Sequence, residues 1–223
     1  MAPRPKFRKP STLLPRILSG LVLVPLSLYV IYLGPPYSLI LAGIVIFGAL
    51  VEWVLLCLKV HFRPSKRAFF ILIGTSYISF SLYFLFMILL ISEGWKFMYW
   101  LLFLVWSTDI AAYAGGRTLK GPKLAPSISP NKTWSGFLSG MVAGVGVGYL
   151  AALWLVPDRF SLIGIIVLVV IAQVGDLIES KAKRWSNTKD SSPLIPGHGG
   201  LLDRLDSLIA VGFALALWQL FHP

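Results

Sequence analysis

The chain has 223 residues, of which 57% are hydrophobic and only 13% are charged, and its mean hydropathy is +0.78. A soluble domain carries about twice that charged fraction, so the composition argues against a soluble enzyme and for a polytopic membrane protein. The net charge is +11, but the basic residues lie in short loops between apolar runs. This arrangement favours membrane lipids and phosphorylated substrates as partners and no nucleic acid.

Seven apolar runs predict an all-α polytopic membrane protein, since each is near the roughly 20 residues that a helix needs to cross a bilayer. They cover residues 13–33, 37–58, 68–91, 95–115, 134–156, 160–179 and 205–221. The runs are continuously apolar rather than alternating, which favours helices over a barrel. The first run is long enough to span and ends without an A-x-A cleavage site, so we expect a retained span rather than a signal peptide.

The basic residues also predict an orientation. With seven spans, all of the 20 lysines and arginines except Lys96 and Arg159 fall on the side of the N-terminus. Cytoplasmic loops carry the excess of Lys and Arg, so we expect the N-terminus and the basic loops at the cytoplasmic face.

Six of the nine carboxylates gather near this same face: Glu52, Asp109, Asp176, Glu179, Asp203 and Asp206. An ionisable group costs at least about 2.5 kcal/mol at the centre of a membrane helix, so such groups usually face a partner or a cavity. For Glu52 and Glu179, a simple position in the membrane interface is an equally open alternative.

The polar stretch from Ser180 to Ser207 is the main exception to the apolar pattern, and its mixture of bases, acids and glycines suits a site for phosphate and metal. Two helices that bring Asp176 and Asp203 together would supply oxygen ligands for Mg²⁺, with room for a second cation. The alternative is that Asp203 and Asp206 only cap the last helix, which leaves Asp176 unexplained. His198 lies between two glycines and is either an acid–base group, a phosphate contact or a turn residue.

A second polar cluster runs from Asp109 to Gly136. Its segment Ser129–Thr133 predicts a turn into a helix N-terminus, where backbone N–H groups and Lys132 can hold phosphate. The alternative is a solvated basic loop that only orients the protein. An ATP-binding P-loop is rejected, because Gly121 is followed by Pro122 and Lys123 and no preceding strand is expected. Downstream, four glycines form a small-residue ridge for close helix packing or an oligomer contact such as a homodimer: Gly136, Gly140, Gly144 and Gly148.

The polar stretch from Ser180 to Asp206 contains S-x-x-K-R, then after four residues K-D, then I-P-G-H-G-G, and after two more residues D-R-x-D. This pattern resembles the signature of the phosphatidate cytidylyltransferases, or CDP-diglyceride synthases. The runs 109–117, 129–134 (SPNKTW) and 173–180 (QVGDLIES) resemble further blocks of that family, so the resemblance covers about the C-terminal half. Two positions depart from the pattern. Ser135 stands where many relatives have Glu, and Ala182 stands where a larger aliphatic residue is usual.

The resemblance implies a membrane enzyme that joins CTP and phosphatidic acid into CDP-diacylglycerol, releases pyrophosphate and requires Mg²⁺. Its metal ligands in this chain would be Asp176 and Asp203. The residues implied in catalysis are Asp176, Lys183, Arg184, His198, Asp203 and Asp206, and those implied in substrate binding are Asp109, Arg117, Ser129, Asn131, Lys132, Ser180, Lys189, Asp190 and Arg204. Residues 1–108 would be N-terminal transmembrane helices and residues 109–223 the catalytic region of one membrane domain.

Two other functions are open on the residues alone. A CTP-dependent lipid kinase acting on a polyprenol or similar alcohol would use similar chemistry, but its products would be CDP and a phospholipid. A transporter of anionic substrates predicts polar residues at mid-membrane and an internal repeat, and neither feature is found in the sequence.

Overall fold

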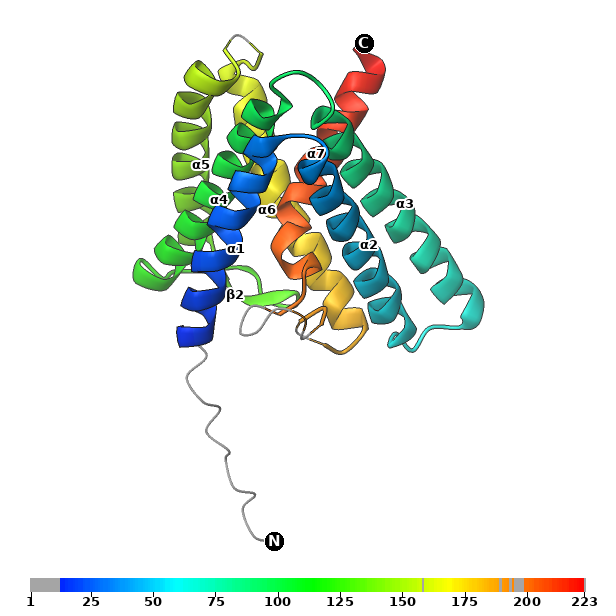
Figure 1. The fold of residues 1–223 in the computed structure, drawn as a ribbon. Coiled ribbons are helices and arrows are strands. Elements are labelled where there is room, and N and C mark those ends of the chain that lie inside the picture. Colours follow the sequence, from blue (N-terminus) through cyan, green and yellow to red (C-terminus); the bar gives the residue numbers. More distant parts are fainter. Residues whose placement is uncertain (1–12, 158, 189, 193, 195–198, 223) are drawn as a thin grey trace, which may run out of the picture.

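The computed structural model describes residues 13–157, 159–188, 190–192, 194 and 199–222. In this part of the chain seven α-helices lie side by side and a short hairpin covers one end (Figure 1). The helices are α1 Leu13–Leu33, α2 Tyr37–Leu58, α3 Pro64–Ile88, α4 Gly94–Thr118, α5 Trp134–Leu155, α6 Leu162–Trp185 and α7 Leu202–Phe221, and the strands are β1 Lys123–Ala125 and β2 Ser129–Thr133.

The predicted helical membrane architecture is confirmed. In the described residues six helices, α2 to α7, are long and apolar enough to cross a membrane, and α1 adds a shorter apolar stretch, Gly20–Leu33. The largest difference from the predicted spans is α6, which continues past residue 179 to Trp185. Ser180 and Lys183 therefore lie on helix α6, although the sequence alone predicted that a loop begins at Ser180.

The β1–β2 hairpin was not predicted. The strands pair antiparallel, with Lys123 opposite Thr133 and Ala125 opposite Ser129. Such short strands, with Pro130 inside one of them, show no clear alternation in the sequence. The predicted turn into a helix is confirmed at its end, because the Thr133 hydroxyl caps α5 by accepting a hydrogen bond from the Gly136 N–H at 3.1 Å.

The glycine ridge of α5 is buried against α4. A methyl group added at Gly136 would lie 2.6 Å from the carbonyl oxygen of Ala112, and one added at Gly140 would lie 3.0 Å from that of Thr108. The indole N–H of Trp100 on α4 donates to the carbonyl oxygen of Gly148 at 2.9 Å. Close packing between α4 and α5 is therefore the role observed for the ridge, and the homodimer stays a prediction.

This packing predicts that Gly144→Ala will lower the thermal unfolding temperature in detergent. The added methyl group would collide with the Thr108 side chain and press on Val169, and overpacking of this kind costs about 1–3 kcal/mol. Gly146→Ala, on the same helix, is the matched control, since a Cβ there meets nothing within 4 Å. Equal unfolding temperatures for the two variants would contradict the assignment of the ridge to helix packing.

The elements predicted to share one membrane face lie at one end of the bundle. Figure 1 shows the hairpin, the connection from α2 to α3 and the start of α7 at the end opposite the C-terminus. One buried cluster includes residues from both predicted regions, such as Leu56, Leu101, Val169 and Val211. The two regions therefore share a core, and residue 109 lies within α4.

Candidate active site

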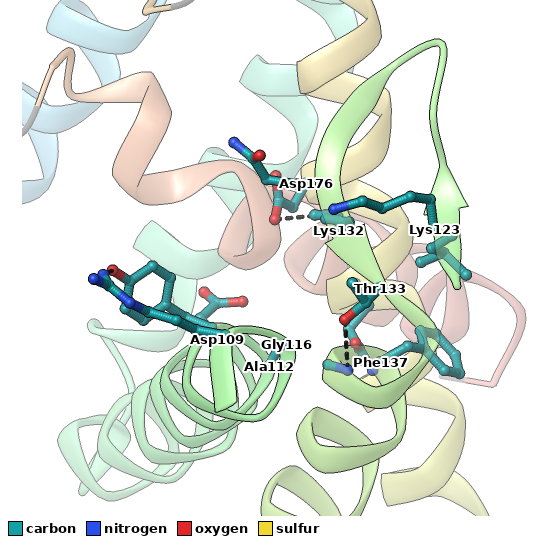
Figure 2. Close-up of a pocket in the computed structure, with 14 residues that line it drawn as sticks. Asp109, Ala112, Gly116, Lys123, Lys132, Thr133, Phe137 and Asp176 are labelled. Carbon is teal, nitrogen blue, oxygen red and sulfur yellow. Dashed lines mark hydrogen bonds and ion pairs between the residues drawn. The ribbon is translucent and has the colours of Figure 1, made fainter. Parts of the chain in front are cut away.

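A cavity of about 540 Å³ lies at the hairpin end, a size typical of ligand sites (Figure 2). Its walls come from α4, the hairpin, the start of α5 and the middle of α6. The lining residues are Asp109, Ala112, Tyr113, Gly116, Arg117, Lys123, Leu124, Asn131, Lys132, Thr133, Gly136, Phe137, Gln173 and Asp176. Five of the predicted site residues are thus brought together: Asp109, Arg117, Asn131, Lys132 and Asp176.

The central contact of this cavity is an ion pair between Lys132 on β2 and Asp176 on α6. The Lys132 Nζ lies 2.6 Å from Asp176 Oδ2, and the two side chains are 24% and 33% exposed. Figure 2 shows this contact bridging the hairpin and α6. Ser180, one turn further along α6, donates from its hydroxyl to Asp176 Oδ1 at 3.4 Å. The predicted pairing of Asp176 and Ser180 on one helix face is therefore observed.

Two residues of α4 form the opposite wall. Asp109 accepts a hydrogen bond from the Ser207 hydroxyl of α7 at 3.2 Å, so α7 fixes this carboxylate at the cavity. Arg117 donates to the Tyr113 hydroxyl at 2.8 Å and stays exposed. An exposed guanidinium at the rim of a cavity is suited to bind an incoming phosphate.

A second ion-pair cluster lies between α6 and α7. Lys183, only 8% exposed, places its Nζ 2.8 Å from Asp203 Oδ1 and 3.1 Å from Glu179 Oε2. Gly175 lets the helices approach, since a Cβ there would lie 3.0 Å from the backbone oxygen of Asp206. Asp206 therefore lies beside the residue that precedes Asp176, and α7 brings its two acids to the polar face of α6.

Asp203 is held from several directions. Besides Lys183, its carboxylate accepts from the Gly200 N–H at 2.8 Å and from the Ser191 N–H at 3.0 Å. The first of these contacts is the helix-capping role that the sequence left open, but capping does not account for the buried lysine. Asp203 is therefore both a cap of α7 and a member of the charged cluster.

Several predicted residues lie elsewhere. Arg184 donates from Nε to the carbonyl oxygen of Ile128 at 3.0 Å and from Nη1 to that of Thr188 at 3.2 Å, so it ties α6 to the hairpin. Ser129, Asp190 and Arg204 do not line the cavity, and the last two are exposed. The predictions for Lys189 and His198 fall outside the described residues.

Lys123 and Gln173 are among the lining residues that sequence reasoning did not assign to the site. Lys123 was treated only as part of a basic loop, and the hairpin that directs it inward was not predicted. For Gln173 a signal existed, because a polar side chain interrupts an apolar span one turn before Asp176.

The chemistry of the two clusters fits a hard divalent cation. Two lysines pair with three carboxylates here: Lys132 with Asp176, and Lys183 with Glu179 and Asp203. Asp109 and Asp206 add two further carboxylates, each of which accepts a hydrogen bond from Ser207. In the described part of the chain no three Asp, Glu, His or Cys residues are arranged to hold a metal by themselves. Mg²⁺ needs only one or two protein carboxylates and takes its other ligands from water and phosphate, so Asp176 and Asp203 stay its predicted ligands.

Comparison with known proteins gives a consistent assignment. Residues 54–221 match the Cytidylyltransferase family. A phosphatidate cytidylyltransferase of Brucella suis is 50% identical over 130 residues, which are 57% of this chain and 47% of that protein. Proteins of the same name from Rickettsia felis and Rickettsia conorii are 39% and 36% identical, with 87% and 97% of this chain and 86% and 95% of theirs aligned. The chain thus spans about half the length of its Brucella relatives and most of the length of its Rickettsia relatives.

Proposed function

The chain belongs to the cytidylyltransferase family, and on that premise we propose that it is a phosphatidate cytidylyltransferase of a bacterial inner membrane. It would join CTP and phosphatidic acid into CDP-diacylglycerol and pyrophosphate. The observation that supports this most directly is the Lys132–Asp176 ion pair, which places a cation and a carboxylate in one cavity beside a membrane-spanning bundle.

The chain's own residues suit the proposed reaction. An oxygen of the lipid phosphate attacks the α-phosphorus of CTP, the bond from that phosphorus to the bridging oxygen breaks, and pyrophosphate leaves with the electron pair. Three cationic side chains line the cavity: Lys123, Lys132 and Arg117. They would bind the phosphates of the substrates. The Lys183 ammonium is held between Glu179 and Asp203 near the end of α6, so it fixes the position of the Asp203 carboxylate. Such chemistry depends mainly on alignment and charge stabilisation.

Mg²⁺ is proposed as the cofactor, and when bound it would offset the negative charge that develops on the phosphates. Asp176 and Asp203 would hold the ion. In the structure Asp176 is paired with Lys132 and Asp203 with Lys183. The side of the membrane is proposed from charge: the connections rich in Lys and Arg mark the hairpin end as cytoplasmic, which gives the site access to CTP.

The test is to incubate the purified chain in detergent with Mg²⁺, phosphatidic acid and CTP labelled on either the α- or the γ-phosphate. We expect the α-label in a cytidine-containing lipid and the γ-label in pyrophosphate, and chelation of divalent cations by EDTA should stop both. In a parallel incubation that contains diacylglycerol or a polyprenol in place of phosphatidic acid, transfer of the γ-label to the lipid alcohol would instead show a lipid kinase. If neither label enters a lipid in the presence of Mg²⁺, the proposed activity is wrong.

A further inference from the structure

Glu52 lies on α2, outside the residues that match the family, yet its carboxylate reaches the start of α7. The residue is only 4% exposed. Its carboxylate accepts four hydrogen bonds: from the hydroxyls of Ser191 and Ser192 at 3.0 and 2.5 Å, and from the N–H groups of Leu201 and Leu202 at 2.9 and 2.8 Å. A carboxylate with four donors is well satisfied in a buried place, whereas most side chains could not serve all four.

The four contacts are divided evenly between the two oxygens. Oε1 accepts from the Ser192 hydroxyl and the Leu201 N–H, and Oε2 accepts from the Ser191 hydroxyl and the Leu202 N–H. A hydroxyl can rotate and accept instead, but a backbone N–H can only donate. An amide at this position would therefore set its NH₂ group against one N–H of α7, whichever way it turned.

These partners connect Glu52 with the charged cluster. α7 starts at Leu202 without a side-chain cap from its own N-cap residue, Leu201, so Glu52 supplies the acceptor that the first turn needs. Asp203 is the next residue, and its carboxylate accepts from the backbone of Ser191, whose hydroxyl Glu52 holds. Glu52 thus fixes both sides of the contact that orients Asp203 toward Lys183.

The space around this carboxylate is closed. A Cβ at Gly200 would lie 2.5 Å from Glu52 Oε2 and would collide with the Ser191 hydroxyl. The glycine preceding Leu201 is thus required by the close approach of Ser191 and Glu52, independently of any ligand.

We propose that Glu52 is a positioning residue of the active site: it fixes residues 191–192 and the start of α7 so that Asp203 and Lys183 keep their orientation. Its effect on turnover rests on the proposed function. Its effect on the segment it holds does not.

The experiment compares Glu52→Gln with Glu93→Gln in the full chain. Gln keeps the size of Glu52 and changes only its acceptors, whereas Glu93 lies at the other end of the bundle in an exposed pair with Lys96. We expect Glu52→Gln to lower kcat/KM for CTP about 10- to 100-fold, the range typical when a residue that orients the groups of a site is changed. Backbone hydrogen exchange should rise in peptides covering residues 190–192 and 199–203, with no rise in those from α4 and α5. Glu93→Gln should change neither quantity.

A Ser191→Ala/Ser192→Ala variant, made alone and with Glu52→Gln, tests the route. If Glu52 acts through the serines, the fold-loss in kcat/KM of the triple variant will be clearly smaller than the product of the fold-losses of Glu52→Gln and of the double serine variant. Wild-type kcat/KM and wild-type exchange in Glu52→Gln would overturn the proposal, as would exchange that rises evenly over the whole chain. If the wild type makes no cytidine lipid, the proposed function fails, and the exchange data alone decide the role of Glu52.

Discussion

Asp203→Asn is expected to lower kcat for CDP-diacylglycerol formation about 100- to 1,000-fold in a chain that still folds. The carboxylate neutralises the buried ammonium of Lys183 and accepts two backbone N–H groups, one from Gly200 just before α7 and one from Ser191 in the connection between α6 and α7. Asparagine keeps the size of the side chain but loses the charge and one acceptor. The measurement is steady-state kinetics of α-labelled CTP incorporation, together with thermal unfolding in the same detergent.

Thermal unfolding shows whether a variant of Asp203 loses activity because the charge is gone or because the start of α7 no longer folds. Asp203→Glu keeps the charge and displaces it by one methylene, so it should unfold near the wild-type temperature and recover only part of the activity. An Asp203→Asn protein with most of its activity would remove this residue from the catalytic cluster, whatever its stability.

Lys132→Met is expected to lower kcat/KM for CTP about 100-fold, because it removes a cation that faces the cavity. It also leaves the Asp176 carboxylate without the ammonium at 2.6 Å. Lys66→Met, on the exposed surface of α3, is the control for loss of a positive charge at the same end of the bundle and should be close to wild type.

The Lys132→Met/Asp176→Asn double variant decides how Lys132 acts. If the lysine only neutralises Asp176, the double variant will be no worse than Asp176→Asn alone. If the lysine binds phosphate, the double variant will be clearly worse than either single change. The first outcome would contradict the phosphate-binding role proposed above.

The helical fold was predictable because a bilayer imposes a single rule, a continuous apolar run of sufficient length, and the seven runs follow it. The boundaries of α1, α2 and α5 agree with the predicted spans within one residue. The end of α6 was missed because hydropathy falls at Glu179 while the helix continues, with Lys183 paired to Glu179 four residues away on the same face.

The site was predictable where helical spacing or a local turn fixes neighbours, as for Asp176 with Ser180 or the Thr133 cap. Contacts between distant segments were not. Nothing in the local sequence indicates that Lys132 pairs with Asp176, or that Glu52 meets α7 some 150 residues later. Both depend on the packing of helices whose apolar surfaces look alike in sequence.

The glycine ridge has a consequence for motion. Because α4 and α5 are in contact almost without intervening side chains, the cavity walls that carry Asp109 and Thr133 are expected to move as one body. The segment between α6 and α7 is different: its described residues 191–192 and 199–201 are held to their surroundings by hydrogen bonds to Glu52 and Asp203. When the site binds substrates of different size, we therefore expect the residues on the α7 side to move and the α4–α5 pair to stay in place.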